Sequence, residues 1–156
     1  VSVARMPKSM EMGCAVVDDG SSTSVRGPTM GELRGIAVDM RDFSDTAQTL
    51  AAIAPFANSP TLIRGIASSR VKETDRVAAV CAELTRLGVP VEEHADGLTI
   101  HPCEHINPTD IQTYGDHRMA MAFSLIGLRA AGIRIVDPGC VSKTFPNFFS
   151  VLATLS

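Results

Sequence analysis

The stretch SSRVKETDRVAAVCAELTRLG, residues 68–88, joins a cluster of charged residues to a strongly periodic apolar segment. Thr74 or Asp75 can cap the start of a helix here, and Gly88 suits the C′ position that ends one. We therefore expect a helix over residues 74–87. Its apolar positions follow the i, i+3, i+4, i+7 spacing of one helix face: Val77, Val80, Cys81, Leu84 and Leu87.

The charged half of this stretch places cations at a helix start, where the helix dipole disfavours them. Lys72 and Arg76 are four residues apart and project toward similar space. Cations near the positive end of a helix cost about 0.3–1 kcal/mol, and Glu73 and Asp75 offset part of that cost. Two interpretations follow: a solvated, ion-paired cap, or a site completed by an anionic ligand that binds the cations and the free N–H groups of the first turn.

Two Asp-Gly dipeptides, at positions 19–20 and 96–97, each separate two short runs with strand-like alternation. An Asp-Gly turn between such runs is typical of a β-hairpin. We expect the first hairpin over residues 14–17 and 22–26, and the second over residues 89–93 and 98–101.

A longer pattern repeats along the chain. Asp45 and Asp116 open two similar helical segments, and Lys72 and Lys143 recur with the same separation. The unit is β-α-β-α-β-β, which predicts an α/β fold with parallel helices whose N-termini lie on one face. We expect a single lobe with one complete unit over about residues 37–102, flanked by partial units over residues 1–36 and about 103–156.

Composition and charge exclude several classes of protein. The 156 residues are 45% hydrophobic and 20% charged, which is ordinary for a globular domain. A net charge of −3 argues against binding nucleic acid over a broad surface, so any anion site is local. The spacing of the four cysteines matches no zinc motif, and we expect reduced, packing thiols.

The sequence also bears on the location of the protein. No apolar run approaches the roughly 18 residues that span a bilayer, and residues 1–5 contain no signal-peptide core. A cytoplasmic enzyme or binding domain is expected. Because the chain begins with Val1 instead of Met, we expect a fragment of a longer protein.

Parallel helices would bring the charged helix starts together. Pro146 suits the N1 position of a helix that follows Lys143. Lys72, Arg76 and Arg118 precede or open other helices. Together with Lys143, four cations are therefore expected close together at the helix N-termini. Such a site suits a substrate that carries phosphate and carboxylate, and a reaction with proton transfer. The other titratable groups expected there are Asp45, Glu73, Asp116 and His117.

Each of these residues also has an ordinary structural interpretation. Asp45 and Asp116 can simply be helix caps, His117 a packing histidine and Lys143 a surface lysine. Their combination, more than any one of them, favours a site.

Three motifs, in this order and at this spacing, resemble the 5-enolpyruvylshikimate-3-phosphate synthase family: RVKETDR at 70–76, DHRMAM at 116–121 and KTFP at 143–146. The resemblance runs from the first hairpin to the C-terminus. It implies the inside-out α/β barrel lobe of enolpyruvyl transferases, and the chain looks like most of the C-terminal lobe.

The resemblance implies transfer of the enolpyruvyl group from phosphoenolpyruvate to the 5-hydroxyl of shikimate 3-phosphate, with release of phosphate, in chorismate biosynthesis. No metal or organic cofactor is implied. An N-terminal lobe, in cis or in trans, supplies most contacts to shikimate 3-phosphate in the family. We therefore expect such a lobe as a partner and expect the lone chain to be inactive.

The resemblance also implies roles for individual residues. Asp45 matches the aspartate that holds the shikimate hydroxyls and is the candidate base for the 5-hydroxyl. Lys72 matches a lysine beside both substrates, and Glu73 the carboxylate that exchanges protons with the methylene carbon of phosphoenolpyruvate. The cations that match the phosphoenolpyruvate site are Arg76, Arg118 and Lys143, with His117 adjacent.

Two alternatives remain open at this point. One is a lobe like that of the enolpyruvyl transferase that acts on UDP-N-acetylglucosamine. The other is a non-catalytic lobe that binds phosphate or a partner chain. Ser68 stands where the family often has Asn, so no substrate contact is assigned to it.

Overall fold

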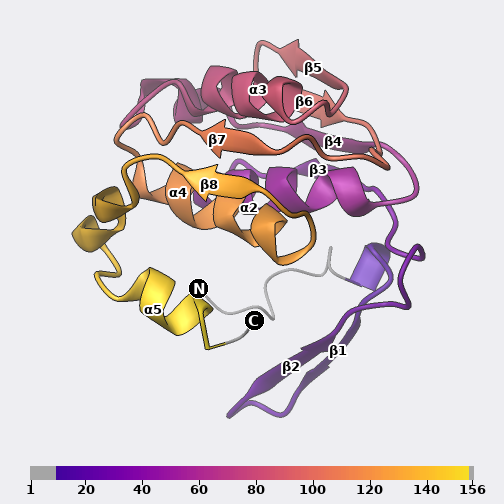
Figure 1. Ribbon diagram of the computed structural model, residues 1–156. Helices are drawn as coiled ribbons and strands as arrows, with labels where there is room; N and C mark the ends of the chain where they lie inside the picture. Colours follow the sequence, from indigo (N-terminus) through magenta and orange to yellow (C-terminus); the bar gives the residue numbers. More distant parts are fainter. Residues whose placement is uncertain (1–9, 155–156) are drawn as a thin grey trace.

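The strands form three separate sheets in residues 10–154, the part of the chain that the computed structural model describes (Figure 1). The largest sheet has the order β3-β4-β6-β5, with β3 and β4 parallel and β6 antiparallel to both of its neighbours. Its strands are β3 (Ala37–Asp39), β4 (Thr61–Arg64), β5 (Val91–His94) and β6 (Gly97–Ile100). The other sheets are a hairpin of β1 (Ala15–Asp18) and β2 (Thr23–Arg26), and a parallel pair of β7 (Thr109–Ile111) and β8 (Ile133–Ile135).

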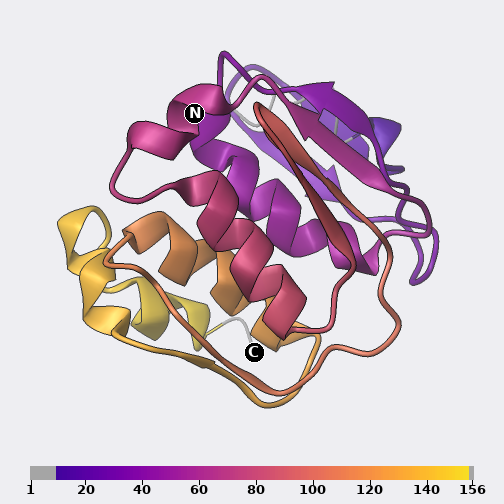
Figure 2. The same cartoon turned by 90° about the horizontal axis from the view of Figure 1, so that it is seen from above.

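Three helices pack between the four-stranded sheet and the β7-β8 pair: α2 (Ala47–Ile53), α3 (Arg76–Arg86) and α4 (His117–Ser124) (Figures 1 and 2). Helix α2 contacts both α3 and α4. A short helix, α5 (Phe148–Leu152), lies near the C-terminus. Short 3-10 helices cover Ser44–Thr46, Ala54–Phe56, Ala67–Val71, Leu125–Leu128 and Pro138–Lys143.

The order of elements from β3 to β6 is β-α-β-α-β-β, and β7, α4 and β8 begin the same order again. The predicted α/β fold class is thus confirmed. The division of the chain at residues 36 and 102 remains a prediction, and its outer ends, residues 1–9 and 155–156, lie outside the described residues.

Helix α3 forms where its periodicity predicts it. Asp75 is its N-cap, with the side chain accepting the N–H of Ala78 at 3.0 Å, so the helix begins one residue later than a Thr74 cap would allow. At the other end Gly88 has φ 84°, which glycine adopts without steric cost. The N–H groups of Gly88 and Val89 then donate to the last turn, at 3.0 and 2.9 Å, and satisfy its free carbonyls.

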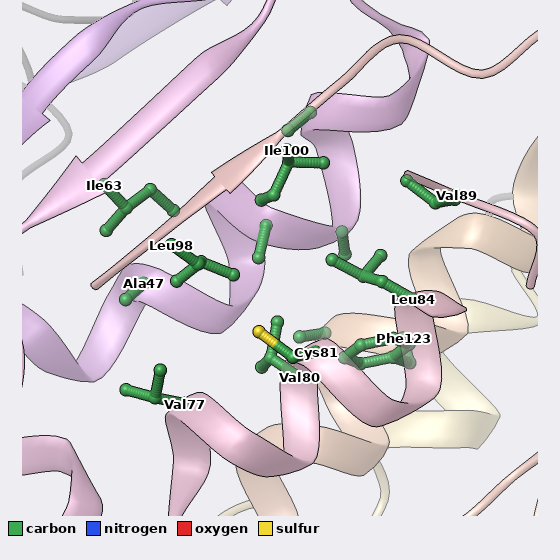
Figure 3. Close-up of a cluster of buried hydrophobic side chains, with 14 of the residues drawn as sticks. Ala47, Ile63, Val77, Val80, Cys81, Leu84, Val89, Leu98, Ile100 and Phe123 are labelled. Atoms are coloured by element: carbon green, nitrogen blue, oxygen red, sulfur yellow. The ribbon is translucent and has the colours of Figure 1, made fainter. Parts of the chain in front are cut away.

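The buried face of α3 packs on the four-stranded sheet (Figure 3). Thr61 and Ile63 of β4 are fully buried, whereas Arg64 faces solvent. Gly97 lies at the crossing of β6 and β4, where an added Cβ would lie 1.9 Å from the carbonyl oxygen of Ile63, so no larger residue fits. The labelled side chains of this core are Ala47, Ile63, Val77, Val80, Cys81, Leu84, Val89, Leu98, Ile100 and Phe123.

Both predicted hairpins are present. The β1-β2 hairpin extends away from the helices (Figure 1), and the side chain of Asp19 accepts the N–H groups of Ser21 and Ser22 at 2.9 and 2.7 Å in its turn. The β5-β6 hairpin forms one edge of the large sheet. None of the helices in residues 10–154 is long and apolar enough to cross a membrane.

The expected helix after Lys143 begins later than predicted, and Pro146 is not its N1 residue. Helix α5 starts at Phe148, with Asn147 as its N-cap. The N–H of Phe148 donates to the carbonyl of Phe145 at 3.0 Å, and this turn encloses Pro146 before the helix begins. Lys143 therefore ends the 3-10 helix that precedes this turn.

We predict that Leu84→Ala lowers the free energy of unfolding by about 2–5 kcal/mol, because it opens a cavity under α3 where Leu84 is 0% exposed. Leu128→Ala is the matched control: Leu128 is 46% exposed, and the expected change is within about 0.5 kcal/mol. Urea unfolding followed by circular dichroism measures both. Equal losses in the two variants would contradict the packing described here.

Candidate anion-binding and catalytic site

The starts of α2, α3 and α4 meet at one side of the helix layer. Asp45 lies in the 3-10 turn that leads into α2, and Arg76 is the first residue of α3. Asp116 caps α4, with its side chain accepting the N–H of Arg118 at 2.8 Å. The predicted convergence of helix starts is therefore observed.

Arg76 is the centre of this cluster and is only 3% exposed. Its Nε donates to Asp116 at 2.6 Å, and Asp116 is 0% exposed. Its other two nitrogens donate to Asp45 at 3.0 Å and to Glu73 at 2.7 Å. Three carboxylates from three segments thus surround one guanidinium, and the buried Arg76–Asp116 pair is fully hydrogen-bonded along one edge.

Two further cations bind the outer sides of the same carboxylates. Arg118 donates to the Asp45 side chain and to its backbone carbonyl, each at 3.0 Å. Lys143 donates to Glu73 at 2.7 Å. Asp45 and Glu73 therefore each bridge Arg76 to an outer, more exposed cation.

Glu73 is strongly acidic in this setting. The hydrogen bond from Lys143 is the largest cause, and backbone hydrogen bonding and the charge of Arg76 act in the same direction. Together they lower the pKa of Glu73 from 4.5 to about 2, so the carboxylate is ionised at neutral pH.

His117 and Lys72 differ from the paired residues. His117 is buried, its Nδ1 lies 3.8 Å from Asp116, and no described residue hydrogen-bonds that nitrogen. Burial lowers the pKa of His117, so the imidazole is neutral at pH 7. Lys72 is exposed and forms no ion pair or hydrogen bond within residues 10–154. Among the cations predicted for the site, all of which lie in the described part of the chain, Lys72 is the one left available to a ligand.

A hollow of about 680 Å³ lies elsewhere, beside Arg86 and Arg134. It is wide and open, and both arginines are already paired, Arg86 with Glu83 and Arg134 with Asp110. The helix starts remain the better candidate because they combine free and exchangeable cations with titratable groups.

The structure brings six of the seven predicted site residues into one cluster, and Lys72 lies next to Glu73 with its side chain unpaired. The sequence indicated that Asp116 can cap a helix, but not that the same carboxylate neutralises Arg76. The sequence carries only a weak signal for this arrangement. Tyr114 and Gly115, which precede Asp116, both have positive φ, but only the glycine indicates a turn to a reader of the sequence.

The fold matches solved enolpyruvyl transferases. An EPSP synthase from Acinetobacter baumannii superimposes with a TM-score of 0.79 at 26% identity, covering 94% of this chain and 37% of that chain. The enolpyruvyl transferase NikO from Streptomyces tendae superimposes with a TM-score of 0.75 at 22% identity, which shows the fold alone. The class of protein is therefore an enolpyruvyl transferase lobe with a charged cluster at its helix starts.

The particular family follows from sequence comparison. The family model for EPSP synthase (3-phosphoshikimate 1-carboxyvinyltransferase) matches residues 3–152, and the chain belongs to that family. The 3-phosphoshikimate 1-carboxyvinyltransferase of Trichormus variabilis is 56% identical over 140 residues, which are 90% of this chain and 32% of that protein. The 3-phosphoshikimate 1-carboxyvinyltransferase 2 of Nicotiana tabacum is 50% identical over 151 residues, which are 94% of this chain and 45% of that protein. The chain thus spans about a third of the Trichormus relative.

We predict that Arg76→Met costs about 3–5 kcal/mol of unfolding free energy, because it leaves Asp116 charged, buried and unpaired. Arg134→Met is the matched control, because it removes only an exposed ion pair, which contributes little to stability. Adding Asp116→Leu to Arg76→Met should recover part of the loss. Urea unfolding measures all three variants, and a loss no greater than that of the control would show that the pair is unimportant.

We predict that Lys143→Met raises the pKa of Glu73 from about 2 toward 4.5, because the largest stabilising contact of the carboxylate is lost. A lowered pKa stabilises the fold above the unfolded value of 4.5, and that stability is lost as pH falls toward about 2. Lys143→Met should remove this part of the acid dependence. Carbon-13 NMR of the carboxyl group, with Lys72→Met as control, measures the pKa; equal values in the two variants would contradict the pairing.

Proposed function

We propose that the chain forms the C-terminal part of an enzyme that transfers the enolpyruvyl group from phosphoenolpyruvate to the 5-hydroxyl of shikimate 3-phosphate and releases phosphate. The observation that carries the proposal is the convergence of Arg76, Arg118 and Lys143 with Asp45 and Glu73 at the helix starts. The family of the chain supports the same reaction. Cations suit the carboxylate and phosphate of phosphoenolpyruvate, and the carboxylates suit proton transfer.

The ion pairs indicate how an anion would enter. Asp45 is ion-paired with Arg118, and Glu73 with Lys143. The anionic groups of phosphoenolpyruvate must therefore displace these two carboxylates to bind the cations. Arg76 stays in place because the fully buried Asp116 holds its Nε. The bound anion then occupies a cradle of two exchangeable cations and one fixed cation, with Lys72 beside it.

Displacement would also change the acidity of Glu73. Without Lys143 its pKa rises, since the hydrogen bond from Lys143 is the largest cause of its depression. A carboxyl group with a higher pKa is a better proton donor near neutral pH. Anion binding thus prepares Glu73 to protonate the methylene carbon of phosphoenolpyruvate.

The proposed reaction has two steps. In the addition, the 5-hydroxyl oxygen bonds to C2 of phosphoenolpyruvate, Glu73 gives a proton to C3, and Asp45 accepts the hydroxyl proton. In the elimination, the C2–O bond to phosphate breaks, Glu73 takes a proton back from C3, and the proton on Asp45 leaves with phosphate. The cations stabilise the departing phosphate. Neutral His117 lies beside Asp116 at the edge of this cradle.

The proposal extends to the partner lobe, the cofactors and the cellular location of the protein. Shikimate 3-phosphate needs groups from an N-terminal lobe, in cis or in trans, and no cofactor or nucleic acid takes part. We propose a cytoplasmic location, although the Petunia hybrida relative is named chloroplastic.

We predict that the lone chain does not turn over, because it supplies only part of the cleft. A chimera in which this chain replaces the matching segment of the Trichormus variabilis relative should release phosphate and form the enolpyruvyl ether of shikimate 3-phosphate. A phosphate assay and mass spectrometry measure both. An inactive but folded chimera would favour a non-catalytic lobe, and turnover with UDP-N-acetylglucosamine instead would favour the other transferase.

In the same chimera, Lys143→Met should abolish phosphoenolpyruvate binding in titration calorimetry, because the cradle loses its most exposed cation, which is 60% exposed. Arg134→Met serves as a control, since it removes a cation outside the cluster. Unchanged affinity in Lys143→Met would remove Lys143 from the cradle.

A further inference from the structure

The loop that joins β7 to α4 delivers the start of α4 to the site, and its backbone is strained. Tyr114 has φ 56° and Gly115 has φ 68°, so two consecutive residues are left-handed. Glycine adopts this conformation freely, whereas the Cβ of tyrosine makes it sterically unfavourable. The loop therefore needs an external contact to hold Tyr114 in place.

Glu83 of α3 provides that contact. Its side chain is 0% exposed, and one carboxylate oxygen accepts the hydroxyl of Tyr114 at 2.8 Å. The other oxygen accepts the backbone N–H of Gln112 at 3.1 Å, and Arg86 donates to both oxygens, at 3.0 and 2.8 Å. A buried carboxylate with four hydrogen bonds is well satisfied, and two of the four come from the loop.

The Tyr114 hydroxyl is a dependable donor. Burial, and then the hydrogen bond to Glu83, raise the pKa of Tyr114 to about 12, so the proton stays on the phenol over the working pH range. The hydroxyl thus donates to a charged acceptor, which is a stronger type of hydrogen bond than one between neutral groups.

Helix α3 contacts the loop at both of its ends. Arg76 and Glu83 are seven residues apart, two helical turns, and so lie on the same face. Glu83 binds the loop at Gln112 and Tyr114, and Arg76 binds Asp116 where the loop enters α4. One helix face therefore fixes the strained loop between a buried anion and a buried cation.

We propose that Tyr114 and Glu83 are positioning residues for the anion site: they fix the loop so that Asp116 reaches Arg76 and Arg118 is directed at the cradle. The proposal rests on the proposed function for its catalytic consequence. Neither residue belongs to the ion-paired cluster: the Tyr114 hydroxyl donates to Glu83, and Glu83 also accepts hydrogen bonds from Arg86 and Gln112 at the far end of the loop. They act through Asp116 and Arg118.

The first experiment uses the chain itself and needs no activity. The Arg76 Nε–H donates to the buried Asp116, so its exchange with solvent, followed by NMR, should be slow. We expect Tyr114→Phe to speed this exchange at least about tenfold, because the loop is released and Asp116 shifts. Asp110→Asn, on the exposed side of β7, should leave it unchanged. Slow exchange in Tyr114→Phe would overturn the proposal.

The second experiment measures kinetics in the chimera. Tyr114→Phe should raise the KM for phosphoenolpyruvate by about tenfold, since small displacements of a binding group are costly, and leave the KM for shikimate 3-phosphate unchanged. Tyr114→Asn should be milder, because asparagine tolerates the left-handed conformation that phenylalanine does not. Asp110→Asn is again the control.

The outcomes separate the two proposals. If the unmodified chimera is inactive, the proposed function fails, and the exchange of Arg76 still decides the positioning role. If the chimera is active and Tyr114→Phe loses only unfolding free energy, with both KM values unchanged, Tyr114 is merely structural and the inference is wrong. Equal effects of Tyr114→Phe and Tyr114→Asn on KM would show that backbone strain plays no part.

Discussion

The guanidinium of Arg76 is held on three sides by carboxylates, and the arrangement of the helix starts depends on it. Arg76 is 3% exposed and its partner Asp116 is 0% exposed. A buried charge is tolerated only when it is paired and hydrogen-bonded. The first residue of α3, the cap of α4 and the turn before α2 must therefore meet at one point. Leu84, Ile63 and Phe123 belong to the apolar core, and apolar packing is less directional than these hydrogen-bonded ion pairs.

The same ion pairs couple the stability of the lobe to its chemistry. Three cations, Arg76, Arg118 and Lys143, are balanced by three carboxylates, so the cluster is close to neutral before any ligand arrives. An entering anion therefore competes with Asp45 and Glu73, and its binding releases the groups proposed to move protons. This arrangement also explains how a chain with net charge −3 can contain a cationic site: the positive charge is local and internally compensated.

Much of the fold could be predicted because its signals are local. The periodicity of α3, its Asp75 cap and the Gly88 terminus lie within one continuous segment, and an Asp-Gly dipeptide marks each hairpin, although the second turn is Ala95-Asp96 and Gly97 is already the first residue of β6. The prediction for Pro146 was wrong for the same reason. Proline is favoured at N1, but a proline in the sequence does not show where a helix begins. Here Pro146 lies inside a turn closed by the hydrogen bond from Phe148 to Phe145, and α5 begins after that turn.

The sequence by itself determined the main helices and the two hairpins, and that charged residues stand at the helix starts. Capping, periodicity and turn geometry depend on residues a few positions apart, so they can be recognised without knowing the fold. Only the tertiary structure decided which charges meet. Arg76 pairs with Asp116 across 40 residues, and Glu73 with Lys143 across 70. Such pairs depend on how whole helices pack, and the same packing lets the buried Glu83 hold Tyr114 in a conformation that its own sequence disfavours.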